Sequence, residues 1–160
     1  MKIFAFVMSA LVASSALADT GPSGSACKPG PAAQCLLARL EGIDLAGKDL
    51  REANFEASIL AGANLAGADL ADGNLHVANL QRSNLAKANL TRVQMFAASL
   101  TGANLSEANL SGANLTRVDL TGADLRGARL DGATMIAVKL GGAKWTDGRV
   151  CAEGSVETCR

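Results

Sequence analysis

Large apolar residues recur at every fifth position over most of this chain. These anchor positions run from Leu40 to Trp145 in 22 consecutive units, and 18 of the anchors are leucine. The residue two positions before the anchor is alanine in 14 units, and the residue directly before it is Asn or Asp in 14 units. An α-helix scatters residues spaced by five around its axis, and a β-strand sends them to alternate faces. The pattern therefore predicts a chain that bends once in every unit.

Glycine marks the expected bend. It occupies the position two residues after the anchor in 10 of the 22 units, which is typical of a corner where a side chain is poorly tolerated. Each unit would point its large and its small residue inward and its polar residues outward. Several such sides close a coil, and stacked coils bury their cores only against their neighbours, as in a solenoid. Lys48 takes an inward position, so we expect an irregular first coil. The period alone leaves open the number of sides and the hand of the coil.

The segments ANLSGANL, ADLRGARL and AGANLAGADLADGNL resemble the pentapeptide-repeat family, whose pattern is A-(D/N)-L-x-x. The resemblance covers about two thirds of the chain, and together with the N-terminal export signal described next it suggests an exported bacterial member. It implies an all-β solenoid: a right-handed, quadrilateral β-helix with four units in each coil and about five and a half coils. Late in the chain, Arg129, Lys139 and Lys144 stand where the family has Asn or Asp.

The N-terminus predicts export. Lys2 precedes a short apolar run, and Ala16, Leu17 and Ala18 form an A-x-A cleavage signal, as in a secretory signal peptide cut after Ala18. The apolar run is shorter than the ~20 residues that a membrane span requires. We therefore expect a periplasmic or secreted protein whose mature chain does not span a membrane. The expected division is a signal peptide at 1–18, a flexible lead-in and N-terminal cap at 19–37, the β-helix at 38–147 and a C-terminal cap at 148–160.

Four cysteines flank the predicted repeats: Cys27 and Cys35 before them, Cys151 and Cys159 after them. An even number in an exported chain suggests disulfides, with three possible pairings. A rod would separate the two pairs by more than the ~7 Å that a disulfide spans between Cα atoms, so we expect Cys27–Cys35 and Cys151–Cys159. Zinc binding is the alternative, but these spacings lack its usual CxxC clusters. The disulfides would staple the ends of the solenoid, where core and strand edges are exposed.

Charge is balanced overall but unevenly distributed. The chain has 15 basic and 15 acidic residues, and loss of residues 1–18 removes only Lys2, which leaves a net charge near −1. This charge argues against nucleic-acid binding. Seven acids and two bases lie between Glu41 and Leu75, whereas nine bases and five acids lie between His76 and Val150. The rod should therefore be acidic at its N-terminal end and basic at its C-terminal end, which would allow head-to-tail association.

A coil of twenty residues would stack apolar side chains on one outward corner. That column would run Glu56, His76, Phe96, Thr116, Ile136; His76, Phe96 and Ile136 are its aromatic and apolar members, and Val77 lies beside them. Exposed apolar patches often mark partner surfaces, although single surface hydrophobes are also normal. We interpret these four residues as a candidate interaction face.

Catalysis finds little support in the sequence. His76 is the single histidine, and the pattern places no nucleophilic side chain beside it. The sequence contains no phosphate loop, dinucleotide fingerprint or metal-binding cluster. We expect no enzyme activity, cofactor or metal. The favoured hypothesis is an exported structural or protein-interaction module with an unknown protein partner or self-association. One alternative, implied by the resemblance, is a DNA mimic that protects or inhibits type II topoisomerases, a role that requires a cytoplasmic, strongly acidic and usually dimeric rod. The other is a passive cell-envelope spacer.

Overall fold

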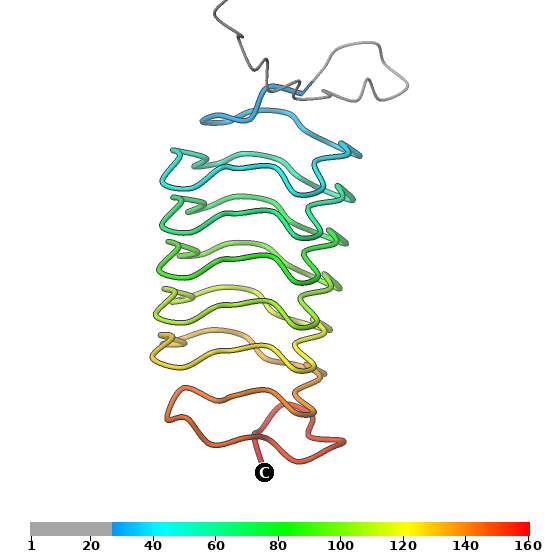
Figure 1. Cartoon of the computed structure of the whole chain (residues 1–160), viewed down its shortest axis with the longest axis vertical. Coiled ribbons are helices and arrows are strands. Elements are labelled where there is room, and N and C mark those ends of the chain that lie inside the picture. The colour runs from blue at the N-terminus through cyan, green and yellow to red at the C-terminus, as the bar shows by residue number, and fades with distance from the viewer. Residues whose placement is uncertain (1–26) are drawn as a thin grey trace, which may run out of the picture.

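The computed structural model describes residues 27–160, so the predicted signal peptide lies outside the described residues. The chain winds into flat coils that stack along one axis (Figure 1). Parallel backbone bridges join residues twenty apart, from Gln34–Asn54 to Asp124–Lys144, which gives four units per coil and about five and a half coils. The strands are single bridge residues, one directly before each anchor, and residues 27–160 contain no helix and thus none that could span a bilayer.

Each unit contributes hydrogen bonds along the stack and one within its own turn. The Leu105 amide donates to the Asp124 carbonyl in the next coil at 2.7 Å, and the Asn104 amide donates to the Ser83 carbonyl in the previous coil at 2.9 Å. The Ala108 amide closes the corner by donating to the Leu105 carbonyl at 3.1 Å. The same pattern recurs from unit to unit, so most backbone groups are paired although no strand exceeds one residue.

The corners explain the glycines. From Ala32 to Gly142, the residue two positions after each anchor has a positive φ, between 51° and 70°. Glycine adopts this conformation without steric cost, whereas side-chain-bearing residues do so less readily. The predicted corner is confirmed, and it is present even where the sequence has Ala, Arg, Lys or Val instead of Gly.

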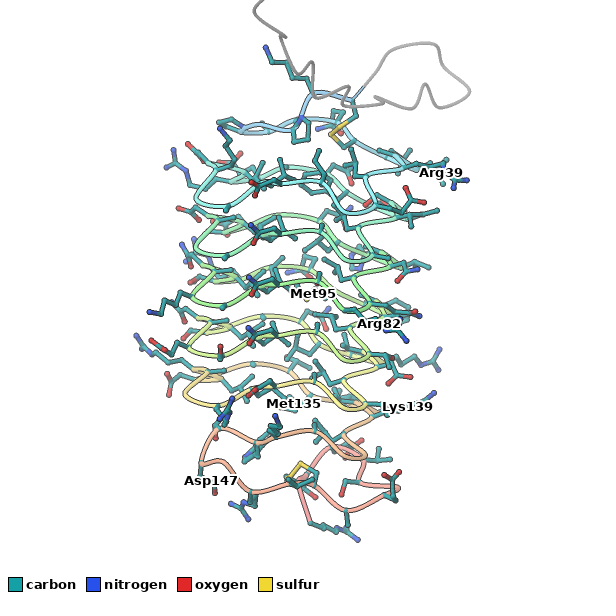
Figure 2. The ribbon with its side chains drawn as sticks, in the orientation of Figure 1. Arg39, Arg82, Met95, Met135, Lys139 and Asp147 are labelled. Carbon is teal, nitrogen blue, oxygen red and sulfur yellow. A yellow bond between two sulfur atoms is a disulfide. The ribbon has the colours of Figure 1, made fainter. Side chains whose placement is uncertain are left out.

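The anchors and the small residues before them fill the interior. The anchors from Leu45 to Leu125 are at most 5% exposed, which confirms the inward assignment. Figure 2 shows Arg39, Arg82 and Lys139 projecting away from the stack. Serine replaces alanine at Ser58 and Ser83, where each buried hydroxyl donates to the carbonyl of the anchor three residues earlier at 2.6 and 2.7 Å. Serine is thus tolerated at this small inward position because the carbonyl of the preceding anchor satisfies its buried hydroxyl.

The sequence predicted that Lys48 makes the first coil irregular, and this prediction is wrong. Its amide closes the usual turn on the Leu45 carbonyl at 3.1 Å, and its carbonyl accepts from Asp69 at 2.9 Å. The side chain is exposed. The backbone therefore stays regular while the charged side chain avoids the core, which is possible in the first coil because no earlier regular coil covers it.

Asn and Asp before each anchor form ladders on the outer faces. The side-chain amides of Asn64, Asn84 and Asn104 each donate to the side-chain oxygen one coil earlier, at 2.9, 3.3 and 3.2 Å. Their own Oδ1 atoms accept from the backbone two residues later. The late basic substitutions follow the same logic, because Lys139 and Lys144 lie 3.5 and 3.7 Å from carboxylates one coil earlier.

Disulfides staple both ends of the stack. The expected pairs Cys27–Cys35 and Cys151–Cys159 are confirmed, with Cα atoms 5.1 and 4.7 Å apart (Figure 2). The four cysteines do not all lie outside the repeats, as the sequence had predicted. Cys35 occupies an anchor position, is 1% exposed, and follows the bridge residue Gln34. The first staple therefore lies within the first coil.

The C-terminal segment closes the rod differently. After Trp145 the chain turns back and forms antiparallel bridges, Lys144–Val150 and Lys139–Val156. We call residues 149–157 the return segment. It lies against two of the four sides of the last coil.

Candidate interaction surface

The predicted apolar column is on one corner of the rod. Val77 is 58% exposed, Phe96 37% and Ile136 60%, while His76 is half-buried. Arg117 lies on the same corner, one coil after Phe96. We call these five residues the corner column. The coil length of twenty confirmed by the bridges places them in register, so the exposed side chains form one stripe rather than scattered points.

Phe96 is held between its neighbours in the column. Its ring meets that of His76 edge to face, with centroids 6.2 Å apart and planes at 72°. The Arg117 guanidinium carbon lies 5.8 Å from the ring centroid on the following coil. Both arrangements are favourable for an aromatic ring. They hold the exposed ring in a defined orientation.

His76 is held by packing more than by hydrogen bonding. Its Nδ1 atom is buried and has no hydrogen-bond partner among the described residues. Buried polar atoms in folded proteins are nearly always paired. The favourable contact between His76 and Phe96 therefore comes with the free-energy cost of leaving Nδ1 of His76 buried without a hydrogen bond.

Val77 is strained. It is β-branched, yet it occupies a corner with φ 56°, a conformation that costs an L-residue roughly 1–2 kcal/mol. Its exposure means that little packing offsets this cost. Ten corners of the same chain have glycine, which would fit here without strain. The same conformation recurs at every corner from Ala32 to Gly142, so it is a requirement of the coil that Val77 meets at a higher cost than glycine would.

An uncharged row of bridge residues borders the corner column, and one of them, Asn74, donates from Nδ2 to the Glu56 carboxylate at 3.1 Å. The bridge residues on this side are amides and one hydroxyl residue: Gln34, Asn54, Asn74, Gln94, Asn114 and Thr134. We call them the amide face. Several are joined along the stack, for example Asn114 Nδ2 to Gln94 Oε1 at 3.3 Å. Depletion of charge is typical of the centre of protein interfaces. Sequence reasoning missed this face, although stacking the sequence in rows of twenty would have shown it.

Charged groups elsewhere on the rod form exposed ion pairs. Arg51 donates to Asp49 at 2.7 and 2.9 Å, and these hydrogen bonds lower the pKa of Asp49 to about 2. Arg126 likewise lowers the pKa of Asp124 by direct hydrogen bonds. Pairs of this kind contribute little stability at a surface. Within residues 27–160 no three His, Cys, Asp or Glu side chains are grouped as metal ligands.

Comparison with known proteins identifies the family. The family model for pentapeptide repeats matches residues 33–70, 58–95 and 98–135, with eight copies of the repeat. The chain belongs to the pentapeptide repeat family. No curated protein matches this pentapeptide repeat protein by sequence.

Solved structures of other family members agree with this fold. Rfr23 from the cyanobacterium Cyanothece 51142 is 27% identical with a TM-score of 0.50, over 70% of this chain and 90% of its own. The protein alr5209 from Nostoc PCC 7120 is 32% identical with a TM-score of 0.54, over 60% of this chain and 84% of its own. Pentapeptide repeat proteins form right-handed quadrilateral β-helices, so the predicted fold class is confirmed.

A further structural neighbour is QnrB1, a plasmid-mediated fluoroquinolone resistance protein. It is 22% identical with a TM-score of 0.41, over 66% of this chain and 59% of its own. A likeness of this size reflects the shared coil and carries no argument for a shared function.

Proposed function

We propose that this pentapeptide repeat protein is an exported, non-catalytic rod that binds a protein partner through the corner column. One observation carries the proposal. Val77 and Phe96 expose apolar surface on successive coils of one corner, and Ile136 does so on the same corner two coils after Phe96, with Thr116 and Arg117 between them. A stripe of this kind, bordered by the uncharged amide face, can lose its water at low cost when a protein surface covers it.

Export supports this role. The predicted signal peptide would be removed after Ala18, and the disulfides at both ends are typical of oxidising compartments. The mature chain would then consist of a lead-in from residue 19, the β-helix at 38–147 and the C-terminal cap at 148–160, acting in the periplasm or outside the cell. Intact mass of the native protein tests this step. We expect a chain that begins at Asp19 and has the mass of the form with both disulfides. A full-length chain with reduced cysteines would contradict export.

Partner binding is tested by capture from an envelope extract with the purified mature protein. Phe96→Ser removes the ring at the centre of the corner column, and we expect it to lose the captured partner. Gln81→Ser is the matched control, because Gln81 is also the residue directly after an anchor but lies on another corner. A partner that binds the Phe96→Ser variant as well as the wild type would refute the proposed surface.

Val77→Gly separates binding from stability. Glycine relieves the strain at φ 56°, so we expect the variant to melt at or above the wild-type temperature. If Val77 contacts a partner, the same variant should bind more weakly. Unchanged binding by a stabilised variant would show that Val77 does not belong to the interface.

Two other functions give different outcomes. A protector of type II topoisomerases would be cytoplasmic and would rescue gyrase in a protection assay; the mature net charge near −1 and the basic C-terminal half do not favour that role. A passive envelope spacer would be exported but would capture no partner at all.

A further inference from the structure

One corner of the rod carries most of the large apolar side chains that the structure exposes. It comprises the two residues after the anchors of one side in each coil: 36–37, 56–57, 76–77, 96–97, 116–117 and 136–137. We call these residues the full corner. Leu36 at 52% and Leu37 at 54% are exposed at its start, in addition to Val77, Phe96 and Ile136. Among residues 27–160, the other exposed large apolar side chains lie in the return segment.

The full corner is complementary to itself when it is read from its two ends. Its three pairs, counted inward, are apolar, oppositely charged and aromatic: Leu36 and Ile136, Glu56 and Arg117, His76 and Phe96. Each pair joins positions at equal distances from the middle of the corner, because the coils have a constant length of twenty residues. A surface with this order matches a copy of itself that is turned end over end.

The two charges of the full corner form no ion pair within residues 27–160. Arg117 lies over the Phe96 ring, and the Glu56 carboxylate accepts a hydrogen bond from the uncharged Asn74. Other exposed arginines, such as Arg92, do pair with a carboxylate of their own chain. Three coils separate Glu56 from Arg117, roughly 14 Å along the rod, so the two cannot meet within one chain. Both charges are therefore available to another molecule.

We propose that the protein partner of the corner column is a second copy of this chain, bound side by side and antiparallel. This inference rests on the proposed function, because it uses the same surface and names its partner. The two-fold axis would run perpendicular to the rod, between the coils of His76 and Phe96. It brings the three pairs of the full corner together between the copies, each of them twice, and closes the assembly as a dimer.

Charge decides between this arrangement and a parallel one. In a parallel pair, a two-fold axis along the rod would place Glu56 beside Glu56 and Arg117 beside Arg117. Like charges across an interface lower the affinity, whereas the antiparallel pair turns the same four groups into two ion pairs. The chain also supplies the complement of every class of residue on this corner, which favours a second copy over an unrelated protein.

The amide face beside the full corner has the same symmetry. The axis would place its members opposite one another in three pairs: Gln34 and Thr134, Asn54 and Asn114, Asn74 and Gln94. A side-chain amide has two N–H hydrogens and an oxygen that accepts twice. The ladder within one chain uses part of this capacity, so amides of two facing copies can bond to each other. The amide face therefore adds polar contacts to the interface without adding a charge.

Charge reversal tests the pairing, by sedimentation velocity of the mature protein over a range of concentrations. We expect a monomer–dimer equilibrium for the wild type. Glu56→Arg and Arg117→Glu each replace the two ion pairs of the dimer by two contacts between like charges. Each should therefore weaken dimerisation at least about tenfold. An equimolar mixture of the two variants should dimerise again, because both contacts of the mixed dimer then join opposite charges.

Arg82→Glu is the matched control for Arg117→Glu. Arg82 is also an exposed corner residue with a positive φ, 56° against 60° for Arg117, but it lies on another corner and projects away from the rod (Figure 2). The same change of charge there should leave the equilibrium unchanged. Far-UV circular dichroism verifies that the variants are folded. Recovery in the mixture needs no comparison of stabilities, so it remains decisive if one substitution lowers the melting temperature.

Cross-linking tests the orientation of the two copies. In the antiparallel dimer, Ala97→Cys places the two new thiols one coil apart along the rod, roughly 5 Å, whereas Ala137→Cys places them five coils apart, roughly 24 Å. A short thiol-specific cross-linker should therefore join the copies of the first variant and not those of the second. Joining of both variants would indicate a parallel pair and contradict the proposed axis.

Other results would overturn the proposal as well. A wild type that stays monomeric at the highest concentration would refute self-association, and so would a mixture of the two charge variants that stays monomeric. If such a monomeric wild type still captures an envelope protein that Phe96→Ser loses, the proposed function holds and only the second copy as partner is wrong. A dimer that neither charge reversal nor Phe96→Ser weakens would refute the self-association through this corner, and unchanged capture by Phe96→Ser would refute the corner column itself.

Discussion

Leu105→Ala tests whether the coils are held apart by their backbone ladders. Leu105 is 0% exposed, and so are its neighbours in the same column, Leu85 one coil before and Leu125 one coil after. The substitution removes groups worth about 2 kcal/mol in transfer from water. Any cavity that remains adds to this loss in proportion to its volume.

The ladders should prevent collapse of that cavity. The Leu85 amide is bonded to Asn104 at 2.7 Å and the Leu105 amide to Asp124 at 2.7 Å, so the spacing between these coils is fixed on both sides. A cavity between coils of fixed spacing keeps most of its volume. We therefore expect a loss in the upper part of the range for leucine to alanine, about 4 kcal/mol.

Urea unfolding followed by far-UV circular dichroism measures this loss, and thermal unfolding should show a melting temperature lower by on the order of 10 °C. Leu40→Ala is the control, because Leu40 is an anchor in the first coil that is only partly buried. It should cost clearly less than Leu105→Ala. Equal losses at the two positions, or a loss below about 1 kcal/mol at Leu105, would refute the reasoning that the ladders keep the cavity open.

Three further predictions concern the surface and the cap. The pKa of Asp49 is lowered from 3.8 to about 2, so the ionised carboxylate stabilises the fold above pH 4 and this stabilisation is lost as the pH falls through 2. The acid-induced fall in melting temperature should therefore be shallower in Asp49→Asn than in the wild type. Asn84→Ala removes an Oδ1 acceptor and an Nδ2 donor from the ladder and should lower the free energy of unfolding by about 1 kcal/mol, measured in urea. Replacing Cys151 and Cys159 by serine should cost about 2–3 kcal/mol from loop closure, and Trp145 fluorescence should change at lower urea than the circular dichroism of the rod.

The periodic part of the fold was predictable because each position repeats the same environment. An anchor such as Leu105 is followed by a corner and preceded by a small residue, and the same constraint acts in every unit. The family resemblance added the coil of twenty, which then placed His76 and Phe96 on one corner. Their stacking was therefore predictable before any contact was known.

The ends were less predictable because their sequence carries no period. The return segment has neither a five-residue repeat nor strand alternation, and its antiparallel pairing depends on contact with residues 138–143, which lie close in sequence but not in a regular register. Cys35, in contrast, obeys the five-residue repeat but was not recognised as part of it. It lies five residues before Leu40 and is in register, but a cysteine is not the residue expected at an anchor, so the regular coil begins earlier than the leucines suggest.

The two ends of the rod obey the same physical constraint with different outcomes. A solenoid buries each coil against the next, so each terminal coil needs a cover for its core and for its free backbone groups. At the N-terminal end the disulfide includes an anchor, Cys35, and ties the first coil together from within. At the C-terminal end the Cys151–Cys159 disulfide instead holds the return segment against one half of the last coil and leaves residues 128–137, the other half, without a covering strand. Stapling alone therefore does not complete this end, because the N–H groups of Leu130, Gly132 and Met135 have no hydrogen-bond partner within residues 27–160.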